Sequence, residues 1–231
     1  MNKENNIKRI IVPSMTLDDV GDYLMETVFS NENLQPALNI LNKNFKRYKK
    51  TYRDWLFTRD KDDLYKIFNP LPYNGKYPQK LTAIPYWSKE GKDVRWITFT
   101  RINHNGFKGI ALGNDTTIDF YSEHCIERYA ERCLGEKLKF EEIDDIFIGD
   151  MLIYNEMSYQ KEYEYKGVVS IYEIVRDGVF LSYPGSKYKM IRTFITSAEF
   201  FEQQKTFVNK GINILNPHLL SEGISPISLV A

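Results

Sequence analysis

The first long hydrophobic pattern in the chain lies between residues 36 and 58, where apolar side chains recur every three or four positions. That period places them on one face of a helix, so it predicts a helix from 36 to 58 with one buried face. The apolar positions are Ala37, Leu41, Phe45, Tyr48, Tyr52 and Trp55. The stretch NPLPYNGKYPQK, residues 69–80, then carries three prolines, which interrupt a helix. We therefore predict a helical N-terminal region over residues 1–70.

After residue 80 the pattern changes to short runs of β-branched and aromatic residues, which predict strands. Four runs separated by turn sequences predict an antiparallel meander, and three more runs follow later in the chain. The first four are LTAIPYW (81–87), VRWITFTRI (94–102), FKGIAL (107–112) and TTIDFY (116–121). The later three are EYKGVVSIYEIV (164–175), GVFLSYPG (178–185) and KMIRTFIT (189–196), with a tight turn at Asp177-Gly178 between the first two.

Three helices are predicted among these strands. Ser122 is a suitable N-cap for a helix that extends to residue 134, and FEEIDDIFIGDML, residues 140–152, predicts a second helix. Thr196 and Glu199 form a capping-box pattern that opens a last helix, which ends near Gly211. We expect an α+β fold in which the helical N-terminal part precedes a mainly antiparallel sheet with the 122–134 helix packed across it. The α+β domain spans 71–211, and residues 212–231 are an irregular tail.

Composition narrows the function only slightly. Thirty-one basic and thirty-one acidic residues cancel, so any site for nucleic acid must be a local basic patch. The two cysteines, Cys125 and Cys133, lie about 12 Å apart along one predicted helix, too far for a disulfide. This favours a reducing compartment. The chain has no long apolar stretch of the kind that spans a membrane, and we expect a cytoplasmic protein without a membrane partner.

The helix 123–134 separates its side chains by chemistry. Its apolar side is formed by Cys125, Ile126, Tyr129, Ala130 and Cys133, which we expect to face the core. One border of that face carries His124, Arg128 and Arg132, and the other carries Glu123, Glu127 and Glu131. Same-sign pairs four residues apart destabilise a helix by a few tenths of a kcal/mol, so a partner outside the helix is expected.

Two partners for the cationic border remain open. Arginine presents a planar fork of donors that matches a phosphate, but the same fork also pairs with carboxylates of the same protein. A metal site is less favoured, because no second His or Cys stands at ligand spacing. The other two histidines, His104 in a hairpin turn and His218 after a proline, are predicted to be surface residues.

The stretch YSEHCIERYAERC (121–133), followed by a second helix and by strands ending in RTFIT (192–196), carries a family resemblance. Residues 119–200 resemble small bacterial domains in which an H-x3-R-x3-R helix packs on an antiparallel sheet. These domains are related to the barnase and RelE-like superfamily of metal-independent ribonucleases, many of which are toxins. The resemblance implies that His124 acts as base or acid, that Arg128 and Arg132 hold the phosphate, and that Thr193 or Arg192 contacts it.

Two hypotheses for function follow. In the first, the chain is a toxin-like endoribonuclease relative that binds RNA, with or without activity, and needs neither a metal nor a cofactor. Its nucleic-acid contacts would come from Lys46, Lys50 and Arg53 on the basic side of the first helix, a side that ordinary solvation also explains, and from Lys189 and Arg192. In the second, it is a non-enzymatic structural or assembly protein of a phage or mobile element. A protein inhibitor or an assembly partner would then be its main contact.

Overall fold

The computed structural model describes residues 11–45, 71–74, 80–87, 94–183 and 187–230. One sheet of nine strands organises these residues, in the order β1-β2-β3-β4-β5-β9-β8-β7-β6. Every neighbouring pair is antiparallel except β5 and β9, which are parallel. The α+β class and the mainly antiparallel sheet are confirmed.

The first half of the sheet contains the predicted meander and one additional strand. Its strands are β1 (Leu71–Asn74), β2 (Lys80–Trp87), β3 (Val94–His104), β4 (Phe107–Gly113) and β5 (Ile118–Ser122). Strand β1 lies inside the proline-rich stretch, where no strand was predicted. A proline cannot donate to a neighbouring strand, but among the described strands β1 is at the edge of the sheet and pairs with β2 alone, so Pro72 is tolerated there.

The second half of the sheet is a meander of four strands, of which three were predicted. They are β6 (Tyr159–Tyr165), β7 (Val168–Val175), β8 (Gly178–Ser182) and β9 (Lys189–Ile195). The run 164–175 was predicted as one strand, but the chain turns within it at Lys166 and Gly167, both with positive φ. The charged sequence YQKEYEY before the turn forms edge strand β6.

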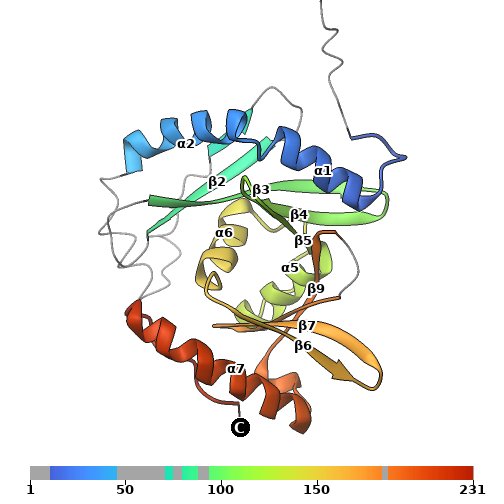
Figure 1. Cartoon of the computed structure of the whole chain (residues 1–231), viewed down its shortest axis with the longest axis vertical. Helices are drawn as coiled ribbons and strands as arrows, with labels where there is room; N and C mark the ends of the chain where they lie inside the picture. Colours follow the sequence, from blue (N-terminus) through green and yellow to red (C-terminus); the bar gives the residue numbers. More distant parts are fainter. Residues whose placement is uncertain (1–10, 46–70, 75–79, 88–93, 184–186, 231) are drawn as a thin grey trace, which may run out of the picture.

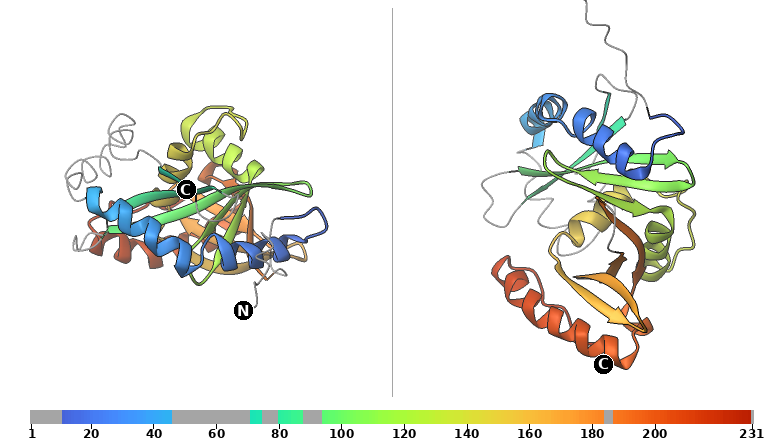
Figure 2. Two further views of the ribbon diagram at one scale, coloured as in Figure 1. Left: turned by 90° about the horizontal axis from the view of Figure 1, so that it is seen from above. Right: turned by 45° about the vertical axis from the view of Figure 1, so that its right-hand side comes forward.

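Two helical segments fill the concave side of the curved sheet (Figures 1 and 2). Helix α5 (Glu123–Tyr129) continues into a π-helical turn, η2 (Ala130–Leu134), and α6 (Asp145–Tyr154) follows. Their buried residues share one core with side chains from β2, β3, β4, β5, β7, β8 and β9. The predicted start of α6 at residue 140 is wrong, because Asp144 caps the helix by accepting from the backbone N–H of Phe147.

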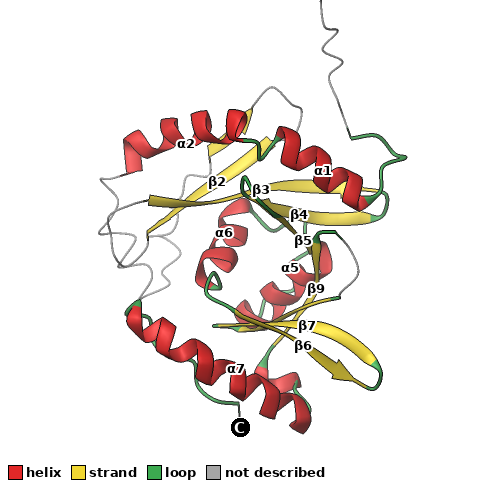
Figure 3. Ribbon diagram, viewed as in Figure 1, coloured by secondary structure: helices red, strands yellow, loops and turns green. Residues whose placement is uncertain are grey.

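The convex side of the sheet is covered at its two ends by different helices (Figures 1 and 3). Helices α1 (Leu17–Thr27) and α2 (Asn31–Phe45) pack on β2 to β5, while α7 (Glu202–Ser221) packs on β6 and β7. The described part of the N-terminal region therefore shares a core with the sheet. Helix α2 begins five residues before the predicted start, with Pro36 inside it, and residues 46–58 of that prediction lie outside the described residues.

The last helix is longer than predicted. The capping box of Thr196 and Glu199 is present, but it closes the short 3₁₀ turn η3 (Ser197–Glu199), and α7 begins afterwards. Gly211 was expected to end the helix, yet α7 continues to Ser221, so residues 212–221 are not irregular. A side chain at 211 would overlap with Ile174 on β7, so this glycine allows the helix and the sheet to pack closely.

Candidate functional site

Ser122, the residue just before α5, fixes the start of this helix against the sheet. The hydroxyl of Ser122 accepts from the N–H of Cys125 at 3.2 Å and donates to the carbonyl oxygen of Arg192 on β9 at 2.9 Å. The predicted N-cap is therefore present, and it also joins the start of α5 to β9. Cys125, Ile126, Tyr129 and Ala130 are buried and Cys133 is partly buried, which confirms the predicted apolar face.

His124 is the most accessible member of the cationic border. Its side chain is exposed in the first turn of α5, and its ring forms no hydrogen bond or ion pair with any residue that the structure describes. An imidazole in this setting is available to a ligand, since neither nitrogen is occupied by a group from the described residues.

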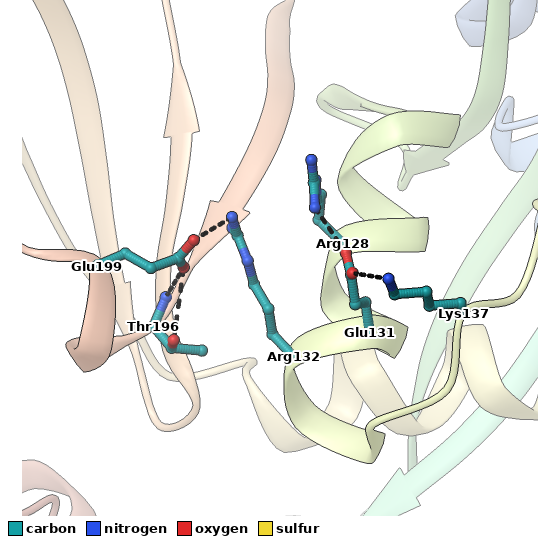
Figure 4. A network of polar contacts seen from close by, with 6 residues as sticks. All are labelled: Arg128, Glu131, Arg132, Lys137, Thr196 and Glu199. Atoms are coloured by element: carbon teal, nitrogen blue, oxygen red, sulfur yellow. Dashed lines mark hydrogen bonds and ion pairs between the residues drawn. The ribbon is translucent and has the colours of Figure 1, made fainter.

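Arg128 pairs with a carboxylate of its own helix (Figure 4). Its Nη1 lies 2.6 Å from Oε2 of Glu131, and Nζ of Lys137 lies 3.6 Å from the other carboxylate oxygen. The hydrogen bond from Arg128 lowers the pKa of Glu131 below its ordinary value. The Arg128 side chain is 41% exposed, so the pair is open to solvent and contributes little to stability.

Arg132 pairs with a carboxylate from a distant part of the chain (Figure 4). It lies in the π-helical turn and donates through Nη2 to Glu199, the same residue whose other carboxylate oxygen closes the capping box with Thr196. The Arg132 side chain is only 18% exposed, and its Nη1 is buried without an acceptor among the described residues. Arg132 therefore connects η2 to η3. Of the two partners expected for it, a phosphate or a carboxylate of the same protein, the structure shows the carboxylate.

Lys189 is also paired, through a cluster of charges on the concave side of the sheet. Its Nζ lies 2.9 Å from Oδ2 of Asp119 on β5 and 2.9 Å from Oε2 of Glu173 on β7. Ser158 donates to the other oxygen of Glu173. Burial raises the pKa of Asp119, although Lys189 acts in the opposite direction. Because two carboxylates already neutralise Lys189, it is a poor candidate for a phosphate contact.

Arg192 and Thr193 differ in their pairing on β9. The pairing register between β8 and β9 shifts at Arg192, which leaves this residue as a bulge with an exposed side chain beside the ring of Tyr183. Thr193 pairs with Leu181, whose side chain packs on the α7 side of the sheet. Thr193 therefore faces away from α5, and the structure does not bring it together with His124. Lys46, Lys50 and Arg53 lie outside the described residues.

The other two histidines differ from each other. His104 was predicted to be a surface residue, but it is buried, and its Nε2 lies 2.7 Å from the carbonyl oxygen of Met15. The turn that follows it, Asn105-Gly106, also binds the N-terminal segment, because Nδ2 of Asn105 donates to the carbonyls of Pro13 and Met15. His218 is exposed on α7, as predicted.

A polar network beside α5 was missed by the sequence analysis. Tyr129 donates from its hydroxyl to the carboxylate of Asp177, and the side-chain amide of Asn155 donates to both groups at 3.2 Å. The backbone N–H of Asp177 donates to Oδ1 of Asn155 at 3.1 Å. The network joins α5, α6 and the β7–β8 turn. The only signal in the sequence was a tyrosine on an apolar helix face, whose hydroxyl needs a buried partner.

Among the described residues, no group of three or more His, Cys, Asp or Glu side chains is arranged to hold a metal ion. Within the same part of the chain, no helix combines the length and apolar character required to cross a membrane. Comparison of the sequence with protein-family models and with curated proteins finds no match, and comparison with solved structures finds none either.

Proposed function

We propose that this chain binds RNA on the surface formed by the exposed side of α5 and the bulge of β9. The observation that carries the proposal is the state of His124, which is exposed and has no partner among the described residues. Arg128 follows one helical turn later, and Arg192 is an exposed bulge residue of β9 whose backbone carbonyl oxygen accepts from Ser122 just before α5. A histidine with two accessible arginines provides donors for neighbouring phosphates of one strand.

The ion pair of Arg128 is compatible with this role. Exposed pairs three residues apart on a helix contribute only a few tenths of a kcal/mol, so a phosphate can replace Glu131 at small cost. Arg132 and Lys189 are excluded from the proposed contact, because each side chain is only 18% exposed and already pairs with a carboxylate of the same chain. The proposed site therefore consists of His124, Arg128 and Arg192.

Catalysis is the weaker part of the ribonuclease hypothesis. Metal-independent cleavage needs one group to take the proton of the 2′-hydroxyl and another to protonate the departing 5′-oxygen. On the proposed surface, His124 is the one described histidine, and Thr193 is on the opposite side of the sheet. We therefore propose an RNA-binding relative of such enzymes whose cleavage is slow or absent.

The test is a binding titration with mixed single-stranded RNA at several salt concentrations in EDTA. The double variant R128Q/R192Q should bind more weakly, and the slope of log affinity against log salt should fall by roughly 1.4, since each single-strand phosphate contact contributes about 0.7. The control K161Q/K210Q removes the same charge from exposed lysines on β6 and α7. Equal losses in both variants would remove the proposed site, and cleavage that His124→Ala abolishes would make the protein an enzyme.

A second candidate function is protein assembly without catalysis, as part of a phage or mobile element. Val168 and Val169 at the β6–β7 hairpin are 53% and 38% exposed, and β6 is an edge strand of the described sheet. Exposed valines beside an edge strand favour contact with another chain. Measurement of the molecular mass in solution for the wild type and V168T/V169T tests this candidate, because only an assembly through this edge would be weakened.

A further inference from the structure

The segment after α7 folds back along its own helix. Gly223, with φ of 69°, reverses the chain, and the N–H groups of Gly223 and Ile224 donate to the carbonyls of Leu220 and Leu219 at 2.9 Å. Residues 224–230 then run antiparallel to α7 (Figure 1). The segment therefore lies beside α7, with Ile227 next to Asn216 and Val230 next to Asn209.

Two asparagines of α7 hold this segment by its backbone. Nδ2 of Asn216 donates to the carbonyl of Ile227 at 3.0 Å, and its Oδ1 accepts from the N–H of the same residue at 2.7 Å. Asn209 makes the same pair of bonds with Val230, at 3.0 and 2.8 Å. Each amide therefore satisfies both backbone groups of one residue, as a neighbouring strand would do.

The spacing of the two asparagines matches an extended peptide. Seven residues of helix rise about 10.5 Å, while three residues of extended chain span about 10 Å. Two side-chain amides at this separation fit residues n and n+3 of any extended segment, because the bonds involve no side chain of the bound segment. The side chains between these two positions point to solvent, because Ser228 and Leu229 are exposed.

The segment leaves the space beneath it only partly filled. Ile227 and Val230 pack against the cluster that contains Val208 and Ile212 of α7. A cavity of about 390 Å³ remains between the segment, α7 and the β7–β8 turn. Its volume falls in the range of ligand-binding pockets. Its lining combines apolar side chains of α7 and β7 with polar groups of the β7–β8 turn and of the segment, in about equal shares.

We infer that this face of α7 is a docking site for an extended peptide of a partner protein, and that residues 224–230 occupy it as an internal substitute. The partner segment carries apolar side chains at two positions three apart, and the side chain at the position of Ile227 is larger than isoleucine, since the cavity has room for it. The backbone bonds give the site affinity, and the cavity gives it selectivity. This site is separate from the proposed RNA surface and does not depend on it.

The test uses the full chain, because its own segment competes at an effective concentration in the millimolar range. In the variant I227D/V230D, the charged side chains weaken the internal segment and free the site. A fluorescent peptide with the sequence ISPISLVA should bind this variant at least about tenfold more tightly than the wild type. The same peptide with Ile227→Phe should bind more tightly still, because it fills the cavity.

Adding N209A/N216A to that variant should weaken peptide binding at least about tenfold, since four backbone hydrogen bonds are lost. The matched control is Asn213→Ala, an exposed asparagine of the same helix outside the two clamps, which should leave binding unchanged. Absence of peptide binding in I227D/V230D with an unchanged unfolding transition would overturn the inference. So would a concentration-dependent wild-type dimer without peptide binding, which would assign the site to exchange of the segment between copies.

A second measurement needs no variant of the segment. Excess phenylalanine-containing peptide, added to the wild-type chain, should displace residues 224–230 and speed the hydrogen exchange of the Ile227 and Val230 amides. The amides of β8 should exchange as before. Unchanged exchange at 227 and 230 under saturating peptide would contradict displacement.

Discussion

Arg132 of the π-helical turn donates to Glu199 of the 3₁₀ turn after β9, and this pair joins two segments that are 67 residues apart in the sequence. The Arg132 side chain is less exposed than that of Arg128, whose partner Glu131 lies on the same helix. The two arginines of the cationic border therefore have different roles. Arg132 stabilises the fold, while Arg128 is available for exchange with a ligand.

The variants R132Q and R128Q should separate these roles. R132Q should lower the free energy of unfolding by about 1 to 3 kcal/mol, because a largely buried guanidinium loses its hydrogen bond to the carboxylate of Glu199. R128Q should change it by less than about 0.5 kcal/mol, as expected for an exposed pair on one helix. Urea unfolding of the two variants and the wild type measures both values. Equal losses would contradict the division of roles.

Gly211 offers a test of the close packing between α7 and β7. Alanine in place of glycine inside a helix usually gains up to about 1 kcal/mol. Here a Cβ would overlap with Cδ1 of Ile174 and lie 2.8 Å from Cδ1 of Tyr159, so G211A should instead lose about 1 to 3 kcal/mol. Urea unfolding gives the sign.

A smaller side chain at position 174 should relieve the overlap with a Cβ at position 211. Ile174→Val removes the Cδ1 atom that the new methyl group would meet, at a cost of about 0.5 to 1.5 kcal/mol by itself. In the G211A background its cost should be smaller or reversed, which a double-mutant cycle detects. Additive effects of the two substitutions would show that the methyl group is accommodated by another route.

Local patterns explain which parts of the fold were predictable. Helix α5 and its buried face follow from Ser122 and from a 3.6-residue period, both of which lie within twelve residues of sequence. The strands β2 to β5 follow from alternating β-branched and aromatic residues. Strand β6 was missed because YQKEYEY places charges where apolar residues would mark a strand, as edge strands often do.

The candidate site was less predictable because its charge partners are distant in the sequence. The parallel pairing of β5 with β9 brings Asp119 to Lys189, and the antiparallel order β7-β8-β9 brings Glu173 to the same lysine. The turn after β9 brings Glu199 to Arg132. Gly211 shows the same limit, because a glycine that ends a helix and one that allows close packing look alike in sequence. The choice between Thr193 and Arg192 also stayed open in the sequence, because the bulge at 192, which interrupts the alternation of β9, is visible only in the strand pairing.

Asp22 should make stability depend on pH at the junction of α1 with the start of β9. Hydrogen bonds from Lys187 and Tyr188 hold the pKa of Asp22 below its ordinary value of 3.8. Its stabilising contribution is therefore complete above the unfolded pKa and is lost as pH falls through the lower folded pKa. D22N should cost less than about 1 kcal/mol near pH 6, because the pair is exposed. The unfolding free energies of wild type and D22N, measured between about pH 6 and pH 2.5, should converge at the acid end, and a constant difference would contradict the assignment.

Lys189 should be the most sensitive of the charged residues, because it balances two carboxylates at once. The side chains of Lys189 and Glu173 are 18% and 13% exposed, and Asp119 is 25% exposed. Replacing Lys189 by glutamine leaves both acids close together with no cation between them. We expect a loss of about 2 to 4 kcal/mol at neutral pH, since removing one partner from a largely buried pair leaves an uncompensated charge.

The pH dependence of K189Q distinguishes lost charge balance from lost packing. Burial raises the folded-state pKa of Asp119 above 3.8, so the folded chain binds a proton at this site more readily than the unfolded chain does. The penalty of the ionised group is present above that pKa and is relieved as pH falls through it. Without Lys189 the mutual repulsion of the acids increases this penalty, so the deficit of K189Q against the wild type should shrink as pH decreases from 7 towards about 4. D119N, which keeps the pair of Lys189 with Glu173, should stay within about 1 kcal/mol of the wild type at neutral pH. A K189Q deficit that is the same at both pH values would mean that the lysine stem, and not its charge, holds β5 and β9 together.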